Sequence, residues 1–282
     1  MTLRKCLAGF STICCILLFN NGKTQQQAVV DDREHLVNLA PVSTFLEDTS
    51  TRLKIDAVLQ LDKEGKFQTI DKPVINFGVS ASAFWLKVLV QNKTSEKIFL
   101  EIGNSALHDI QVYEYGSNGS LAYHHSGSWQ KFKERELKQV DYLFPLSQQA
   151  ATQVIYLRVQ HPRGTQFPLV AGTLNAFYKV AGDRNVIEGI YYGFMLLMVL
   201  YNLFVYFSLK DVSYIYYVLY ILMMGLLNAS INGYTFRYLW PSQPQLNLYE
   251  DIIGSFAGIT GILFATSFLN TKTNTPYFHK LF

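Results

Sequence analysis

The pattern of apolar and polar positions divides the chain into a half of short alternating runs and a half of long apolar runs. Two long runs, 187–209 and 213–231, are separated only by Lys210, Asp211 and Val212. A helix of about 20 mostly apolar residues can cross the roughly 30 Å hydrocarbon core of a bilayer. The two runs therefore predict a transmembrane helical hairpin.

A third apolar run, 252–269, predicts a third span. It contains Gly254 and Gly258, and small residues four positions apart allow helices to pack closely inside a membrane. The segment 232–251 between the second and third runs includes Trp240, an aromatic residue typical of the headgroup level. We expect this segment to be a short interfacial loop.

From about 36 to 178 the apolar residues alternate over short runs that end at Gly, Pro, Asn, Asp or Ser. In the clearest run Leu86, Val88 and Val90 share one face, while Trp85 lies on the other and is expected to be buried. The regular spacing predicts an all-β sandwich. Its predicted strands are 57–61, 84–91, 97–102, 109–115, 121–124, 142–146, 153–160 and 169–177.

The N-terminus has the features of a secretory signal peptide over residues 1–27. Arg4 and Lys5 precede an apolar stretch, 6–19, and a polar stretch follows, so cleavage is expected between 21 and 28. The alternative is a lipoprotein acylated at Cys14 or Cys15, which the preceding residues fit poorly. All three cysteines lie in this segment, so a mature chain would form no disulfide.

These patterns predict three parts: a signal peptide at 1–27, an extracytoplasmic β-sandwich at 28–180 and membrane helices at 185–282. Export of the sandwich would place the Lys210–Asp211 turn in the cytoplasm and the loop with Trp240 outside. Membrane lipid is then an expected partner of the second half. Much of the 15% aromatic content surrounds the apolar runs, as expected at membrane interfaces.

Composition and motifs argue against several other functions. The net charge is +3, with no basic run that would indicate a nucleic-acid partner. His124 and His125 are adjacent on a predicted strand and point to opposite faces, so we expect no shared metal and no cofactor. The sequence lacks a Gly-rich phosphate loop, a G-x-S-x-G elbow and paired catalytic carboxylates. We therefore expect no enzyme activity in this chain.

Ligand recognition is the chemistry that the β half could supply. Sugars stack on aromatic rings and accept hydrogen bonds from Arg and amide groups, and the candidate residues are Tyr113, Trp129, Arg135, Arg158 and Gln160. The alternative is that these residues form the solvated side of a sheet.

Two polar positions in the membrane half have structural interpretations. Asn202 lies near the middle of the first span, where we expect it to hydrogen-bond across the bundle, either for packing or for signal transmission. Asp211 and Ser213 lie where the second helix begins and are expected to cap it.

Several motifs resemble those of the bacterial seven-transmembrane receptors with diverse intracellular signalling modules (7TMR-DISM). In the membrane half they are Tyr201-Asn202-Leu203-Phe204 and Tyr238-Leu239-Trp240-Pro241. In the β half, the run from Phe84 to Asn92 and Tyr156-Leu157-Arg158-Val159-Gln160 are similar to the second extracellular domain type of that family.

The resemblance implies an all-β jelly roll, similar to carbohydrate-binding domains, followed by an α-helical transmembrane bundle in a bacterial inner membrane. Family members continue through four more spans into a cytoplasmic signalling module, whereas this sequence ends at Phe282 after the third predicted span, so the bundle is expected to be partial. The implied function is a receptor whose exported domain senses a ligand, with carbohydrate as the candidate class. The alternatives are a membrane-anchored sandwich that docks an envelope protein, and an envelope enzyme, which the missing catalytic motifs make the weakest.

Overall fold

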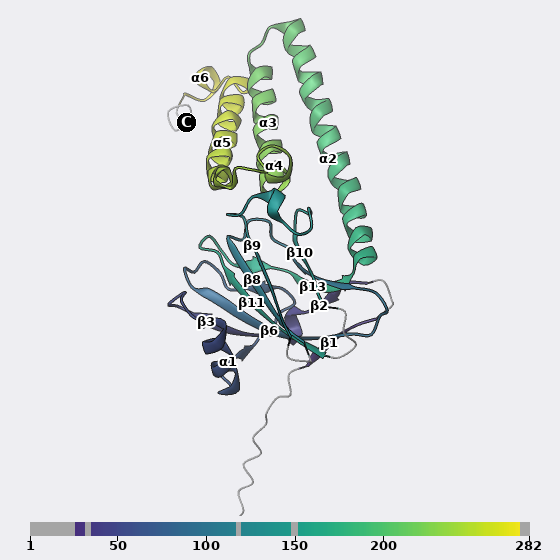
Figure 1. Cartoon of the computed structure of the whole chain (residues 1–282). Helices are drawn as coiled ribbons and strands as arrows, with labels where there is room; N and C mark the ends of the chain where they lie inside the picture. The colour runs from purple at the N-terminus through teal and green to yellow at the C-terminus, as the bar shows by residue number, and fades with distance from the viewer. Residues whose placement is uncertain (1–25, 32–34, 117–119, 148–151, 277–282) are drawn as a thin grey trace, which may run out of the picture.

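The computed structural model describes residues 26–31, 35–116, 120–147 and 152–276. Figure 1 shows a β-rich part through which the first half of the chain runs, with helices rising from one end of it. The predicted signal peptide falls almost wholly outside the described residues, apart from Gln26 and Gln27. Gln27 begins strand β1, so a cleavage that keeps this strand intact has to precede it.

The β half contains two main sheets. The larger sheet has the order β4-β3-β6-β11-β8-β9, with β1 parallel to β6, and the smaller has the order β10-β7-β13-β2. A separate pair is formed by β12 and β5. The strands are β1 Gln27–Val30, β2 Val37–Asn38, β3 Thr44–Asp48, β4 Gln68–Thr69, β5 Ile75–Asn76, β6 Ala83–Asn92, β7 Ile98–Ile102, β8 Asp109–Tyr115, β9 Leu121–Ser126, β10 Tyr142–Pro145, β11 Thr152–Gln160, β12 Gln166–Phe167 and β13 Leu169–Thr173.

The main core lies between the two sheets. Leu86 and Val88 of β6 and Leu157 of β11 point into it from the larger sheet, and Leu100 of β7 and Leu169 of β13 meet them from the smaller sheet. Each of these side chains is at most 1% exposed. The alternation of apolar and polar residues therefore predicts the buried face of these strands correctly, and the predicted β-sandwich is confirmed.

One predicted strand is a helix. Residues 57–61 belong to α1, Ile55–Lys63, which covers the outer face of the larger sheet. Ile55, Val58 and Leu59 follow helical spacing, and with Trp85 of β6 they form a second apolar cluster. The short window 57–61 also fits a strand alternation, and helical spacing is recognised only when Ile55 is included.

The last predicted strand, 169–177, is also too long. Strand β13 ends at Thr173, whose side-chain oxygen accepts a hydrogen bond from the Ala176 N–H at 3.4 Å and caps helix α2. Helix α2 runs from Leu174 to Leu209, and its first turns pack Leu174 and Phe177 against the outer face of the smaller sheet. The first membrane helix and the sandwich are thus joined without a linker.

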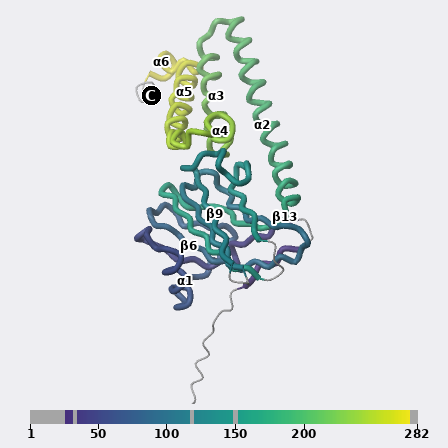
Figure 2. The backbone as a smooth tube through the Cα atoms, viewed as in Figure 1, coloured from purple at the N-terminus to yellow at the C-terminus, as the bar shows by residue number. Residues whose placement is uncertain are grey.

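Three helices are long and apolar enough to cross a membrane: α2, α3 (Ser213–Ile231) and the segment that includes α5 (Glu250–Phe268). Helix α2 has 36 residues. At 1.5 Å per residue it is about 54 Å long, which exceeds the hydrocarbon core by roughly 24 Å. Its length therefore leaves part of the helix outside the hydrocarbon core. The N-terminal end of α2 reaches the β-rich part of the chain (Figures 1 and 2).

The remaining helices are short. Helix α4, Tyr234–Tyr238, and the 3-10 helix η3, Pro244–Tyr249, connect α3 to α5, and α6 is Thr271–Asn274. The 3-10 helices η1, Ala40–Val42, and η2, Phe132–Glu134, lie in the β half. The predicted interfacial loop thus contains helical structure.

The predicted cap at Asp211 is present. The Asp211 carboxylate accepts a hydrogen bond from the Ser213 N–H at 2.9 Å, where α3 begins. This backbone bond, helped by the Ser213 side chain, lowers the pKa of Asp211. The preceding Lys210 ends α2 with a left-handed backbone, φ 57°.

Helices α3 and α5 pack side by side (Figure 2), but through a different set of small residues than predicted. A Cβ at Gly254 would be 3.7 Å from Leu227 of α3, and one at Gly261 would be 3.2 Å from Tyr220. Ala257 between them is 2% exposed. A Cβ at Gly258 would meet nothing within 4 Å, so Gly258 is not part of the close contact.

Asn202 is buried, as expected, at 6% exposure. Its amide nitrogen, however, donates to the Met198 carbonyl oxygen of the same helix at 2.7 Å. The expected bond across the bundle is therefore not the one that this nitrogen makes. A side-chain donor can hydrogen-bond to the carbonyl oxygen four residues earlier in its own helix, which the sequence alone did not indicate.

Candidate ligand groove and the junction with the membrane helices

Four of the five candidate ligand residues line one groove of the sandwich, ≈ 720 Å³ in volume. Tyr113 is on β8, Arg158 and Gln160 are on β11, and Trp129 follows β9. The side chains of Val112, Leu157 and Val159 point into the core, so their neighbours point to the opposite, outer face. Residues 51–56, which include the first two residues of α1, close the other side of the groove.

Arg158 is held rigidly at the base of the groove. It is 7% exposed and forms a short ion pair with Asp109. Its second guanidinium nitrogen donates to the Thr51 carbonyl oxygen at 3.0 Å and to Gln160 Oε1 at 2.9 Å. These bonds connect β11, β8 and the segment before α1, so they fix the shape of the groove.

Asp109 extends this network across the sheet. His125 Nε2 lies 2.7 Å from one Asp109 oxygen, and the Gln111 amide donates to the other at 3.1 Å. Gln130 Nε2 lies 3.0 Å from His125 Nδ1, and the Tyr113 hydroxyl donates to Gln111 at 2.9 Å. The groove is therefore lined by a continuous set of polar groups in fixed orientations.

Four further residues of this network were not predicted from the sequence: Asp109, Gln111, His125 and Gln130. Asp109 and Gln111 alternate with core residues on β8, as Tyr113 does, so strand alternation could have placed all three on the outer face. His125 comes from the neighbouring strand, where it lies directly opposite Gln111. His124, the adjacent residue, instead pairs with Glu136 at 3.0 Å, so the two histidines point apart as predicted.

Trp129 supplies a flat apolar surface at the edge of the groove. Its side chain is 64% exposed, and its ring centroid lies 4.9 Å from that of His108. An exposed ring beside a fixed polar network can stack on one face of a ligand while the network bonds its hydroxyl or carboxylate groups. The arrangement therefore suits a polar ligand with an apolar face.

Arg135, the fifth candidate, lies elsewhere. It is 7% exposed, and burial, the largest effect, lowers its pKa. Its guanidinium donates to the Val140 carbonyl oxygen at 2.6 Å and lies 4.1 Å from the Tyr142 ring centroid. The same group lies 5.5 Å from the ring of Phe236 in α4. Arg135 thus joins the sandwich to the membrane half.

The chain between α3 and α5 is docked on this end of the sandwich, which the sequence did not predict. The Phe132 N–H donates to the Pro241 carbonyl oxygen at 2.9 Å, and the Phe132 and Phe236 rings meet edge to face at 5.6 Å. A Cβ at Gly233 would be 2.7 Å from Ser105, so only glycine fits there, and its φ of 72° also favours glycine. The segment that was predicted to be an interfacial loop therefore packs against the sandwich.

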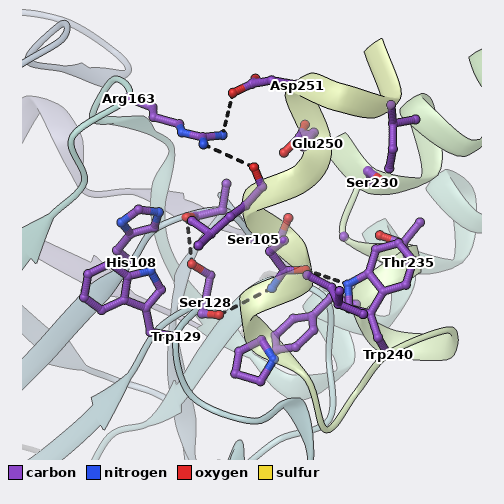
Figure 3. Close-up of a pocket in the computed structure, with 18 of the residues that line it drawn as sticks. Ser105, His108, Ser128, Trp129, Arg163, Ser230, Thr235, Trp240, Glu250 and Asp251 are labelled. Carbon is purple, nitrogen blue, oxygen red and sulfur yellow. Dashed lines mark hydrogen bonds and ion pairs between the residues drawn. The ribbon is translucent and has the colours of Figure 1, made fainter. Parts of the chain in front are cut away.

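A second cavity, ≈ 240 Å³ in volume, lies within this junction (Figure 3). Arg163 crosses it to form an ion pair with Asp251 at 3.0 Å and a hydrogen bond to the Leu248 carbonyl oxygen at 3.3 Å. On the other side, the Asn247 amide donates to the Ser128 carbonyl oxygen at 3.4 Å. Side chains from both halves of the chain thus surround one polar space.

His108 and Trp129 line both the groove and the junction cavity. His108 also contacts the ring of His161, whose centroid is 4.5 Å away. Burial, followed by the charges of His108 and Arg163, lowers the pKa of His161 to about 4, so this imidazole is neutral near pH 7. Because Trp129 also lines the junction cavity, a ligand that touches Trp129 would contact a residue that borders on the membrane half.

Comparison with known proteins gives two family matches that together cover the sandwich and the helices. Residues 40–173 match the model described as 7TMR-DISM extracellular 2, and residues 184–282 match the model described as 7TM diverse intracellular signalling. A search of curated proteins finds no match to the chain. The two matches meet near the start of α2, where the sandwich passes into the first membrane helix.

Proposed function

The chain belongs to the family of seven-transmembrane receptors with diverse intracellular signalling modules, with that family's second extracellular domain type, and we propose that its groove is the ligand site of this receptor. The ligand class that we propose is carbohydrate. The observation that carries the proposal is that Trp129, Tyr113, Arg158 and Gln160 converge on one groove. This groove combines an exposed aromatic ring with fixed hydrogen-bonding groups, as a sugar site needs.

The connectivity of the sandwich supports the assignment of a jelly roll. The orders β6-β11-β8-β9 and β2-β13-β7-β10 place eight strands in two sheets, with neighbours in each sheet that are distant in sequence. Double-sheet jelly rolls are built from eight strands in this way and include lectin domains. Strands β3 and β4 extend one sheet at its edge.

The shared wall of the groove and the junction cavity supports a route for the signal. A ligand changes an equilibrium between two arrangements only if it binds one of them more tightly. Trp129 and His108 line both the groove and the junction cavity, so movement of either residue on ligand binding would alter the packing beside Asn247 and Asp251 in that cavity. We propose that ligand binding changes how α4 and η3 dock on the sandwich.

The remaining parts of the proposal concern location and chemistry. We propose that the chain lies in the inner membrane of a bacterium, with the sandwich outside the cytoplasm and a signalling module on the cytoplasmic side as its partner. We also propose that this chain is not itself an enzyme, because the polar groups of the groove are engaged with one another in a pattern suited to binding.

The test is saccharide binding to the purified 282-residue protein in lipid nanodiscs. We expect at least one member of an oligosaccharide panel to raise the thermal midpoint in a saturable way. Trp129→Ala should weaken that binding at least about tenfold, a loss of ~1.4 kcal/mol, because the stacking surface is removed.

The matched control is Tyr178→Ala, which removes another exposed aromatic ring, 53% exposed, outside the groove. This variant should bind as the unaltered protein does. If no saccharide in the panel binds, carbohydrate is the wrong ligand class. If Trp129→Ala binds with unchanged affinity, the groove is the wrong site.

A further inference from the structure

A third cavity, ≈ 400 Å³ in volume, lies between α2, α3 and α4. It adjoins the junction cavity, with which it shares Thr235, and it has no lining residue in common with the groove. Tyr192 of α2 and Tyr234 and Tyr238 of α4 contribute aromatic walls, and Glu188 of α2 contributes a carboxylate. The remaining lining is mostly apolar. This combination of rings and one acid differs from the mixed polar and apolar lining of the other two spaces.

The three rings form adjoining walls. Tyr192 and Tyr234 meet edge to face with centroids 6.3 Å apart, and Tyr234 and Tyr238 are nearly parallel with centroids 6.4 Å apart. Ring faces carry partial negative charge and attract cations within about 6 Å, and cages of such rings recognise organic ammonium groups. Arg237 already lies over the Tyr238 ring at 5.1 Å, yet it does not line the cavity.

Glu188 adds a formal negative charge to these walls. One carboxylate oxygen, Oε1, accepts a hydrogen bond from Asn232 at 3.2 Å. The other, Oε2, is buried and has no hydrogen-bond partner in the described part of the chain. Arg184, one turn earlier in α2, is engaged with Asp141 at 2.8 Å. A buried carboxylate oxygen without a donor is costly unless a ligand supplies one.

We propose that this cavity binds the ammonium head group of an outer-leaflet phospholipid. The faces of the three rings would hold the cation, and Glu188 Oε2 would accept a hydrogen bond from it. The position fits a lipid source, because Glu188 and Tyr192 lie at the start of the first apolar run and Tyr and Trp residues mark the headgroup level. Leu239, an exposed apolar residue, also lines the cavity and suits contact with the lipid's glycerol and acyl region.

The experiment compares the full chain in nanodiscs of phosphatidylglycerol alone and of phosphatidylglycerol mixed with phosphatidylethanolamine. Native mass spectrometry should show phosphatidylethanolamine retained in preference to phosphatidylglycerol. Glu188→Gln should reduce that preference roughly three- to thirtyfold, because the charge is lost while the bond from Asn232 can remain. Thermal unfolding in phosphatidylglycerol alone checks that the variant folds.

A second variant fills the cavity without altering its charge. A Cβ at Gly189 would meet nothing within 4 Å, so Gly189→Leu can project into the cavity without a backbone clash. The matched control is Gly193→Leu, one turn later in α2, where a Cβ also meets nothing and which does not line the cavity. We expect Gly189→Leu to abolish the phosphatidylethanolamine preference and Gly193→Leu to preserve it.

Two results would overturn the proposal. One is equal retention of the two lipids by the unaltered protein, and the other is a preference that survives Gly189→Leu. A further experiment in detergent uses tetramethylammonium to identify the source of the cation. If this soluble ion stabilises the protein and added phosphatidylethanolamine does not displace it, the cavity binds a free ammonium ion, which would contradict a lipid ligand. None of these results depends on saccharide binding in the groove.

Discussion

Burial displaces the pKa values of two ionisable side chains of the sandwich, Glu101 and His161, in opposite directions. Burial raises the pKa of Glu101, with a further rise from Asp141 and a smaller lowering from Arg184, from 4.5 to about 7. Burial lowers the pKa of His161 from 6.5 to about 4. Both effects disfavour the charged form, so each residue makes folding depend on pH, but with opposite sign.

Glu101 gives a testable pH dependence. The folded chain holds the Glu101 proton up to a pH near 7, whereas the unfolded chain releases it near 4.5. The contribution of Glu101 to stability is therefore full below pH 4.5 and is lost as the pH rises through 7. Glu101→Gln cannot ionise. We expect its thermal midpoint to exceed that of the unaltered protein at pH 8 and to equal it at pH 4.5, as measured by unfolding across that range.

The control for this prediction is Glu96→Gln, which removes an exposed acid of the same region. Its midpoint should follow the unaltered protein at every pH. A Glu101→Gln variant that gains nothing at pH 8 would contradict the idea that the folded structure disfavours the Glu101 carboxylate. His161 acts oppositely: its contribution is present above pH 6.5 and is lost as the pH falls through 4.

At the residue scale, the sequence indicated four residues of the groove but not their connections. Alternation along β11 was sufficient to place Arg158 and Gln160 on one face, whereas Tyr113 reaches that face because β8 pairs with β11. Arg135 follows no such alternation, because it directly follows the 3-10 helix η2 and does not lie in a strand. Its partner Phe236 is about a hundred residues away in sequence, and no local pattern brings the two together.

At the scale of elements, the docking of α4 on the sandwich depends on Arg135. Its guanidinium bonds two carbonyl oxygens, those of Gln139 and Val140, and lies over three aromatic rings. Arg135→Met keeps an unbranched apolar side chain but removes these interactions. We expect a loss of about 2–4 kcal/mol in the free energy of unfolding, measured with denaturant in nanodiscs.

The control for Arg135→Met is Lys131→Met. Lys131 is exposed and makes only a surface ion pair with Glu134 at 3.5 Å, which is worth about 0–1 kcal/mol. Equal stabilities for the two variants would mean that the buried cation is no better than an apolar side chain at this position, an outcome known for some buried charges.

Elements with one regular period were predicted best. The boundaries of β8 were predicted correctly because polar residues and Gly116 bound a clean alternation. Helix α1 and the start of α2 were assigned to strands, because short windows fit both periods and tertiary contacts decided between them. Gly258 was assigned to helix packing from its spacing alone, whereas the direction in which α5 faces α3 determines which glycines touch.

At the scale of the whole molecule, the long helix α2 and the docked segment between α3 and α5 give the sandwich two connections to the membrane half. One is covalent and continuous from Thr173, and the other is the non-covalent junction around Arg163, Asn247 and Asp251. The groove shares Trp129 and His108 with that junction. The proposed coupling of the groove to the membrane helices through this junction requires that the docked arrangement exists in the membrane.

Cysteine crosslinking across the junction tests this arrangement most directly. All three native cysteines lie between residues 6 and 15 and can be replaced by serine to give a cysteine-free background. Ser128→Cys combined with Asn247→Cys places one thiol on each half, at positions joined by a hydrogen bond of 3.4 Å. Ser128→Cys combined with Lys210→Cys, at the far end of α2, is the control pair. In membranes, a short bifunctional thiol reagent should link the first pair rapidly and leave the control pair unlinked; equal rates for the two pairs would contradict the docked structure.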